Sequence, residues 1–172
     1  NTEAEWLVIR RFKEAGLKPV GGSFMHSFDV NIEMANSISD QKQNFASPLQ
    51  LVGHNMIVFL GANRKKPSDK YVIILTHHDG HGTLDGTLYG GADSDCSGIV
   101  ALISLARMFY THKMITGEVF SKNLLFVSLD AHNYSLQGAY ALYEDLAKGV
   151  MRDPDSGREI TLKDVDEVIN IE

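Results

Sequence analysis

Histidine and acidic residues gather in one stretch of the chain, Tyr71–Gly98, which reads YVIILTHHDGHGTLDGTLYGGADSDCSG. Imidazole nitrogens and carboxylate oxygens are the groups that bind zinc and related metals in proteins. We therefore interpret this stretch as the centre of any metal chemistry in the chain. Its candidate groups are His77, His78, Asp79, His81, Asp93 and Asp95, with Ser94 between the last two.

The spacing of the first three groups separates them onto two sides. Side chains alternate across a strand, so His77 and Asp79 are predicted to share a direction while His78 points the other way. An aspartate two residues beyond a histidine can accept a ring N–H and orient a ligand imidazole. The alternatives are that His77 is only a loop histidine and that His78 is packed or hydrogen-bonded. We expect His81 to line the loop.

The elements that must position these groups follow from hydrophobic periodicity. Residues 71–76 and 124–129 are short, nearly continuous apolar runs, which are typical of strands buried on both faces. Helical patterns begin near Ser97 and at Leu136, and a last strand is expected over Val165–Ile171. This alternation predicts an α/β domain with a mixed, largely parallel sheet flanked by helices on both faces.

The amino-terminal part has a different pattern. An amphipathic helix is predicted from Thr2 to Gly16, with Thr2 and Glu5 at capping-box spacing. Period-two patterning over 24–34 predicts a half-exposed strand, 35–48 is a predicted loop, and 51–60 is predicted to be a second strand.

Ligands of open α/β sheets collect at the carboxyl ends of the strands. Here those ends are residues 77–79, 130–133 and 170–172, and all three contain groups that bind metal or transfer protons. Sequence patterning alone therefore predicts a polar site at this edge of the sheet.

Composition excludes several classes of function. The 172 residues are 44% apolar and 22% charged, with a formal net charge of −6, which suits a globular domain and disfavours nucleic acid as a partner. No run of about 18 apolar residues predicts a membrane span, and no signal peptide is visible. We expect residues 1–172 to form a single domain, truncated at its carboxyl-terminal end.

The motifs HHD, GADSDCSG and DAHN, with Gly138 after them, resemble those of the zinc aminopeptidases of the aminopeptidase S type. That family includes relatives of glutamate carboxypeptidase, transferrin receptor and glutaminyl cyclase, and the resemblance spans almost the whole chain. It implies a helix-flanked sheet with two zinc ions at the strand ends, which share the water that attacks a peptide carbonyl.

The resemblance assigns roles unevenly. It places His77 at the first zinc-ligand histidine and Asp79 at the carboxylate that orients it. Ser94 stands where the family has an aspartate that bridges both metals. The paired glutamates of the family, a general base and a metal ligand, correspond to His132 and Asn133.

Further carboxylates complete this implied set. Glu172 falls on another ligand position, and the last histidine ligand lies beyond the chain. Asp93 and Asp95 flank the substituted position and are possible rescue ligands, although helix capping by Asp95 or Ser97 is the alternative. His132 is a candidate general base near neutral pH or a relic of the former site.

Two functional hypotheses follow. The first is an aminopeptidase-like zinc hydrolase with one or two ions, acting on a peptide or protein substrate. The second is a pseudo-peptidase that binds a protein or peptide partner, because serine and asparagine weaken a dinuclear site. The loss of these ligands also resembles nicalin and nicastrin, degenerate members that serve in membrane-protein complexes. The resemblance implies a secreted, periplasmic or lumenal location.

Overall fold

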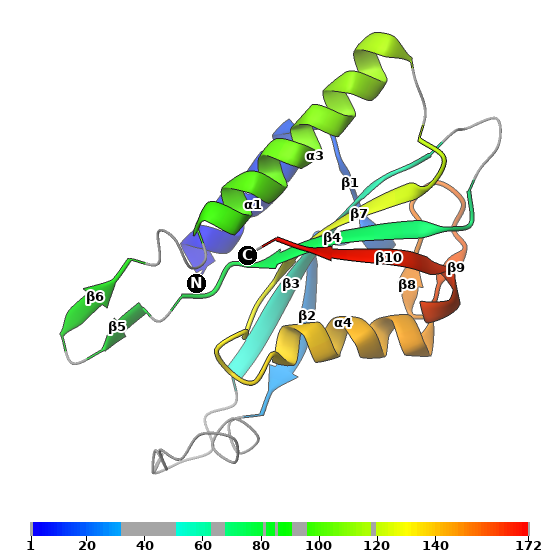
Figure 1. The fold of residues 1–172 in the computed structure, drawn as a ribbon. Helices are drawn as coiled ribbons and strands as arrows, with labels where there is room; N and C mark the ends of the chain where they lie inside the picture. Colours follow the sequence, from blue (N-terminus) through cyan, green and yellow to red (C-terminus); the bar gives the residue numbers. More distant parts are fainter. Residues whose placement is uncertain are drawn as a thin grey trace.

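The computed structural model describes residues 2–31, 51–62, 68–80, 82–84, 86–90, 96–117 and 120–171. A central sheet separates helices on its two faces, with α1 and α3 on one face and α4 on the other (Figure 1). The predicted α/β fold is therefore confirmed. The helices are α1 (Thr2–Glu14), α3 (Ser97–Thr116) and α4 (Gln137–Lys148), and the short 3₁₀ helices are η1 (Val20–Gly22) and η3 (Leu162–Asp164). The strands are β1 (Lys18–Pro19), β2 (Met25–Val30), β3 (Leu51–Leu60), β4 (Tyr71–His77), β5 (Gly82–Leu84), β6 (Thr87–Tyr89), β7 (Asn123–Leu129), β8 (Met151–Arg152), β9 (Glu159–Ile160) and β10 (Val165–Asn170).

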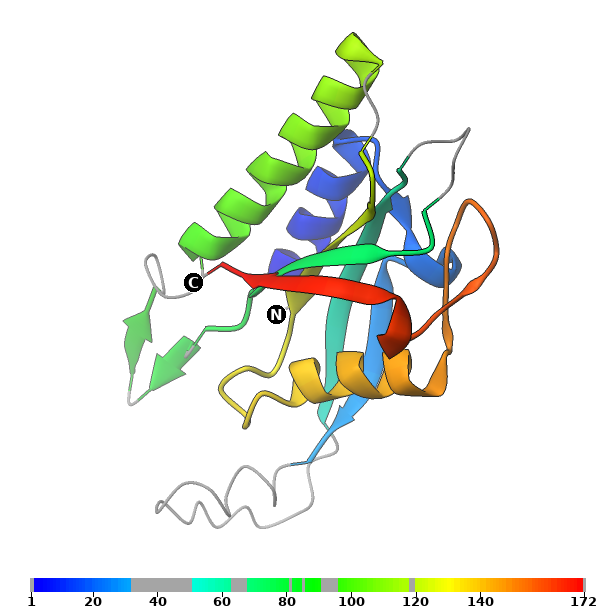
Figure 2. The same ribbon diagram turned by 45° about the vertical axis from the view of Figure 1, so that its right-hand side comes forward.

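The central sheet has the strand order β1-β3-β7-β4-β10, and β2 also pairs with β3. Strand β4 runs parallel to both β7 and β10, whereas β3 is antiparallel to β1, β2 and β7. The sheet is thus mixed. Its parallel part consists of β4, β7 and β10, the strands whose carboxyl ends were predicted to form a polar site. Figure 2 shows the same strands between α1 and α3 above and α4 below.

Two apolar clusters hold the layers together, one on each face of the sheet. Phe12 of α1 and Leu102 of α3 are fully buried against Val58 and Phe126 on one face. Leu142 of α4 packs with strand residues of opposite parity on the other face. Alternation along β4 and β7 supplies both clusters, which explains why these strands are apolar almost throughout.

The ends of α1 and α3 follow from local chemistry. Gly16 lies just beyond α1 with φ of +78°, a conformation that favours glycine, and its N–H donates to Lys13 O. Helix α3 begins at Ser97, and Cys96 is its N-cap residue, so the predicted capping by Ser97 is wrong. Asp95 lies outside the described residues.

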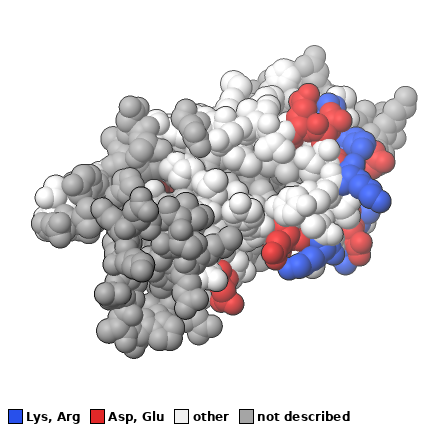
Figure 3. Space-filling view, turned by 60° about the horizontal axis from the view of Figure 1, so that its bottom comes forward, with Lys and Arg blue, Asp and Glu red and all other residues white. Residues whose placement is uncertain are grey.

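Two hairpins were not predicted. Strands β5 and β6 pair in the region where His81 was expected to line a loop, and β8 pairs with β9 further along the chain. The region of β8, β9 and η3 carries the ion pairs Arg152–Glu159 and Arg158–Asp164. Figure 3 shows acidic and basic side chains intermixed on the described part of one face, with neither sign forming a broad patch. No helix among the described residues is both long and apolar enough to cross a membrane.

Candidate functional site

The carboxyl ends of β4, β7 and β10 meet at one edge of the sheet. In the parallel register His77 lies opposite Leu129, and Asn170 lies opposite Leu75. Residues 77–79 and 130–133 therefore lie at the carboxyl ends of neighbouring strands, as predicted from the sequence. Glu172 lies outside the described residues.

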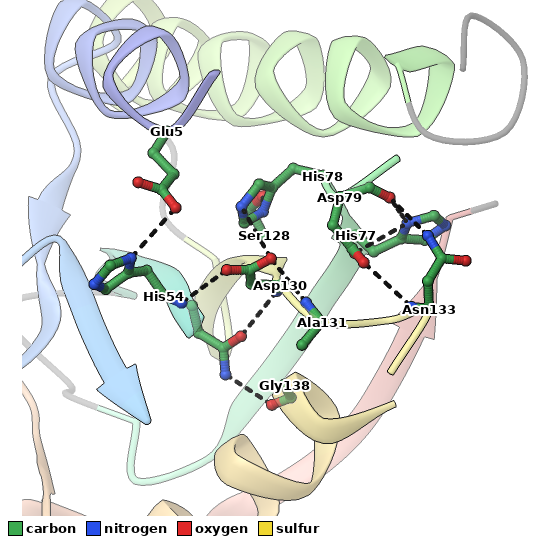
Figure 4. A network of polar contacts seen from close by, with 11 residues as sticks. Glu5, His54, His77, His78, Asp79, Ser128, Asp130, Ala131, Asn133 and Gly138 are labelled. Atoms are coloured by element: carbon green, nitrogen blue, oxygen red, sulfur yellow. Dashed lines mark hydrogen bonds and ion pairs between the residues drawn. The ribbon is translucent and has the colours of Figure 1, made fainter. Parts of the chain in front are cut away.

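His77, the last residue of β4, and the two residues that follow it point to two sides, as alternation predicts. His77 and Asp79 turn toward the loop that leads from β7 into α4, whereas His78 turns toward α1 (Figure 4). Each side forms its own cluster, which we name the His77 cluster and the His78 cluster. The His77 cluster comprises His77, Asp79, His132 and Asn133; the His78 cluster comprises Glu5, His54, His78, Ser128 and Asp130.

In the His77 cluster, two imidazole rings lie face to face. The ring centroids of His77 and His132 are 4.0 Å apart, with an interplanar angle of 15°. His77 Nδ1 lies 3.6 Å from Asp79 Oδ1 and 3.4 Å from the Asp79 carbonyl oxygen. Asn133 donates its backbone N–H to Asp79 Oδ2 at 3.1 Å. The side chains of His132 and Asn133 thus belong to the same contact set as His77.

A strained turn presents His132 and Asn133. Ala131, Ser135 and Leu136 have φ values of +53°, +61° and +58°, which side chains other than glycine and asparagine rarely adopt. The Ala131 carbonyl accepts hydrogen bonds from two backbone N–H groups further along the turn. Backbone strain of this kind persists only where surrounding contacts hold it, and it is common at functional sites.

Asn55 ties this turn to the sheet. Its side chain is 1% exposed, accepts the backbone N–H of Asp130 at 3.1 Å and donates to the Gly138 carbonyl at 2.7 Å. A Cβ at Gly138 would lie 2.1 Å from the Asp130 carbonyl oxygen. The glycine therefore lets α4 begin directly against the end of β7, which holds the segment between Asp130 and Gly138 in place.

The His78 cluster joins α1, β3, β4 and β7. His54 Nδ1 lies 3.3 Å from Glu5 Oε1, and His78 Nδ1 lies 2.9 Å from Ser128 Oγ. Asp130 accepts the backbone N–H of His54 at 3.0 Å and that of Ala131 at 2.8 Å. Burial lowers the pKa of His78, although the carboxylates of Asp130, Asp79 and Glu5 act in the opposite direction. The His78 imidazole is therefore neutral at pH 7.

Residues predicted from the sequence have distinct outcomes. His78 is hydrogen-bonded through Nδ1 and its side chain is 2% exposed, as expected for a packed or hydrogen-bonded histidine, but its Nε2 has no hydrogen-bond partner among the described residues. Glu5 is buried, and its carboxylate contacts His54 of β3. Four of the predicted site residues lie outside the described part of the chain together with Glu172: His81, Asp93, Ser94 and Asp95.

The sequence did not predict three members of the His78 cluster: Glu5, His54 and Ser128. Glu5 lies far from His78 in sequence, and only helix packing brings the two together. Two signals for this cluster were present in the sequence: Asp130 lies at a strand end, and His78 was predicted to point to the opposite side of the strand from His77. Neither signal showed which element His78 would meet on that side of the strand.

Comparison with protein families identifies the lineage. The sequence model of Peptidase family M28 matches residues 55–172, which is more than half of the chain. The chain belongs to this family. None of the curated proteins compared with it matches the M28 chain.

Solved structures agree with this M28 fold. LapB from Legionella pneumophila has a TM-score of 0.56 and 20% identity, covering 99% of this chain and 36% of LapB. The LapA aminopeptidase of the same organism has a TM-score of 0.56 and 17% identity, covering 98% and 35%. The glutaminyl cyclase of Porphyromonas gingivalis has a TM-score of 0.53 and 14% identity, covering 95% and 49%. The M28 chain thus spans between about a third and a half of each of these structures.

The M28 lineage suggests zinc, and the described donors near His77 fit two zinc ions poorly. Asp79 is the only carboxylate of the His77 cluster, and it accepts a hydrogen bond from Asn133. Two dications at short separation need several carboxylates to offset their mutual repulsion. The side-chain chemistry of His132 and Asn133 adds one imidazole and one amide, both uncharged when they act as ligands.

Proposed function

We propose that this M28 domain does not hydrolyse peptide bonds, and that it uses the peptidase fold to bind a protein or peptide partner. The contact between His132 and His77, at 4.0 Å between ring centroids, carries the proposal. By resemblance, the family has a general-base glutamate at position 132. Here a second imidazole occupies that position and packs flat against His77, the histidine to which the resemblance assigns a ligand role.

The chemistry of the substituted positions supports the same proposal. Ser94 in place of a bridging aspartate and Asn133 in place of a glutamate remove two negative charges from the implied ligand set. A hydroxyl and an amide carbonyl are weak ligands for zinc compared with carboxylates. Without a metal-polarised carbonyl, His132 as a base has little rate enhancement to contribute.

The subfamily resemblance points in the same direction. Ser94 and the absence of the paired glutamates resemble nicalin and nicastrin, degenerate members of the fold that serve in membrane-protein complexes. For this chain we infer the corresponding class of role, a binding or scaffolding domain with a protein partner.

A second candidate, a hydrolase with one zinc ion, rests on the pair His77 and Asp79. His77 Nδ1 lies 3.6 Å from Asp79 Oδ1, and by resemblance Asp79 would orient the imidazole. In this alternative His77 and Glu172 would bind the ion, with Asp93 or Asp95 as an added ligand. His132 would then act as the base.

An activity assay distinguishes the binding domain from the zinc hydrolase. It measures the hydrolysis of aminoacyl-nitroanilides by the purified full-length protein in the presence of added zinc. We expect the wild type to be no faster than His77→Ala, with both at the rate of the buffer. Activity in the wild type that His77→Ala abolishes would show a zinc hydrolase. Circular dichroism of both proteins checks that the comparison is between folded chains.

The binding half of the proposal needs its own measurement. Fluorescence titration with peptides that carry free or acetylated amino termini tests whether the former substrate side holds a chain terminus. We expect peptides with free termini to bind and the His132→Ala variant to bind them more weakly. Equal absence of binding for all peptides, together with no captured protein partner, would contradict a binding role.

A further inference from the structure

We propose that Glu5, His78 and Asp130 form a structural site for a divalent transition metal, which fastens α1 to the carboxyl ends of β4 and β7. One ligand atom from each residue, two carboxylate oxygens and an imidazole nitrogen, lies within 4.8 Å of the others. None of these residues is a metal-binding position implied by the M28 resemblance. They lie on the opposite side of β4 from His77 (Figure 4).

An unpartnered nitrogen points to a missing ligand. The side chain of His78 is 2% exposed, yet its Nε2 has no hydrogen-bond partner. Asp130 Oδ1 is 3.9 Å from this nitrogen, which is too long for a hydrogen bond. A buried polar atom without a partner is costly, and native structures normally satisfy such atoms. A metal ion between His78 Nε2 and Asp130 Oδ1 would give the His78 nitrogen its missing partner, while Asp130 Oδ1 keeps its hydrogen bond from the Ala131 N–H.

The geometry is close to that of a metal site. Zinc bonds of about 2.0–2.2 Å to nitrogen and oxygen place two tetrahedral ligands roughly 3.4 Å apart. The His78–Asp130 separation of 3.9 Å needs to close by only a few tenths of an ångström. All three ligand atoms lie within 4.8 Å of one another, so the remaining separations would close by side-chain movements of at most about 1.4 Å.

Charge supports the assignment. Glu5 and Asp130 are 4% and 6% exposed, and they bring two carboxylates to one buried location. Buried charges of the same sign are stable only when a cation or several hydrogen-bond donors compensate them. A dication bound to two carboxylates and one neutral imidazole gives a neutral group. Carboxylate and imidazole together suit zinc and the neighbouring first-row metals.

Each proposed ligand also has an outer partner. Ser128 Oγ accepts from His78 Nδ1 in the tautomer that leaves the Nε2 lone pair free for a metal. His54 Nδ1 contacts Glu5, and the backbone N–H of His54 donates to Asp130. Such partners orient ligands and are a regular part of metal sites. The His54 side chain is 27% exposed, so the cluster reaches solvent at this residue.

The test is the effect of zinc on the Tm of the full-length protein. Metal is first removed with a chelator, and the Tm is then measured with and without added zinc. Zinc at 100-fold above its dissociation constant should raise the Tm of the wild type by about 5–10 °C. Glu5→Gln should abolish this rise, whereas Glu3→Gln, a change at an exposed position of the same helix, should leave it intact. Ser128→Ala should weaken zinc binding by about 10–100-fold, because it removes only the partner of a ligand.

The adjacent histidines provide the control for location. His78→Ala should lose the zinc effect and His77→Ala should keep it. Isothermal titration with zinc gives the same comparison at constant temperature for any variant with a lowered Tm. No rise in the wild type, or an equal rise in Glu5→Gln and Glu3→Gln, would overturn the proposal. Either result would leave the question of peptide hydrolysis at His77 to its separate assay.

Discussion

Replacing Asn55 with alanine should remove the hydrogen bonds that attach the segment between Asp130 and Gly138 to β3. The amide of Asn55 serves two buried backbone groups, the Asp130 N–H at 3.1 Å and the Gly138 carbonyl at 2.7 Å. Each group left without a partner costs about 1–3 kcal/mol in free energy of unfolding. We therefore expect Asn55→Ala to destabilise the protein by about 2–5 kcal/mol.

Asn123 provides a matched control at the other end of the strands. It is also buried, at 4% exposed, and it likewise bridges two backbone groups. Its amide donates to Ser68 O at 2.7 Å and accepts from Ala62 N at 2.8 Å. Asn123→Ala should lose a similar free energy, but without disturbing Asp130.

Urea unfolding at pH 7, followed by circular dichroism, measures both losses. The zinc-dependent rise in Tm then separates the two variants, because only Asn55→Ala releases the backbone that positions Asp130. A loss below about 0.5 kcal/mol in Asn55→Ala would refute the hydrogen-bond reasoning. Equal weakening of the zinc effect in both variants would refute the claim that Asn55 positions the site.

Three further predictions concern the turn and the acid response. Gly138→Ala should cost about 1–3 kcal/mol in urea unfolding, because its Cβ would lie 2.1 Å from a backbone oxygen; no loss would show that α4 can shift freely. Leu136→Asn should gain about 0.5–1 kcal/mol in the same assay, because asparagine tolerates the positive φ and Leu136 is 46% exposed; a loss would indicate that the leucine side chain stabilises the turn. Burial acts to raise the pKa of Asp153, but the hydrogen bond from Tyr71 at 2.6 Å and backbone N–H donors outweigh it and lower the pKa. Since the folded-state pKa lies below the unfolded value, the ionised carboxylate stabilises the fold above about pH 4, and this contribution is lost as pH falls further. Tyr71→Phe should therefore cost about 1.5–3 kcal/mol at pH 7 and clearly less near pH 2, and a cost independent of pH would contradict this assignment.

The central strands and main helices could be predicted because their signals are local. The apolar run at 51–60 coincides with β3, and the helix expected from Leu136 to Lys148 is α4 to within one residue. Strict alternation also separated His77 from His78 correctly. In each case the pattern depends on neighbours in sequence, which a single chain displays fully.

The contacts of the site could be predicted only in part, since they depend on packing between distant elements. Glu5 reaches His54 and the His78 cluster through the docking of α1, and spacing within α1 suggested a capping role instead. The stack of His132 on His77 requires the left-handed turn at Ala131, a conformation that alanine gives no reason to expect. Roles assigned to Asp79, His77 and Glu172 by resemblance stay predictions.

His77 and His78 lie on opposite sides of β4, so metal binding and peptide hydrolysis need not occur at the same place in this M28 domain. On the side of β4 to which the resemblance assigns catalysis, an imidazole contacts His77 and an asparagine contacts Asp79. On the other side, two buried carboxylates and an unpartnered imidazole nitrogen converge. The account therefore predicts that any tightly bound metal serves the attachment of α1 and takes no part in peptide hydrolysis.

Zinc stoichiometry is the most direct test of this central claim. Elemental analysis after zinc loading and gel filtration would compare the wild type, His77→Ala and His78→Ala as folded proteins. We predict one zinc per chain in the wild type and in His77→Ala, and none in His78→Ala. Two zinc ions per chain in the wild type, or loss of zinc in His77→Ala, would contradict the account.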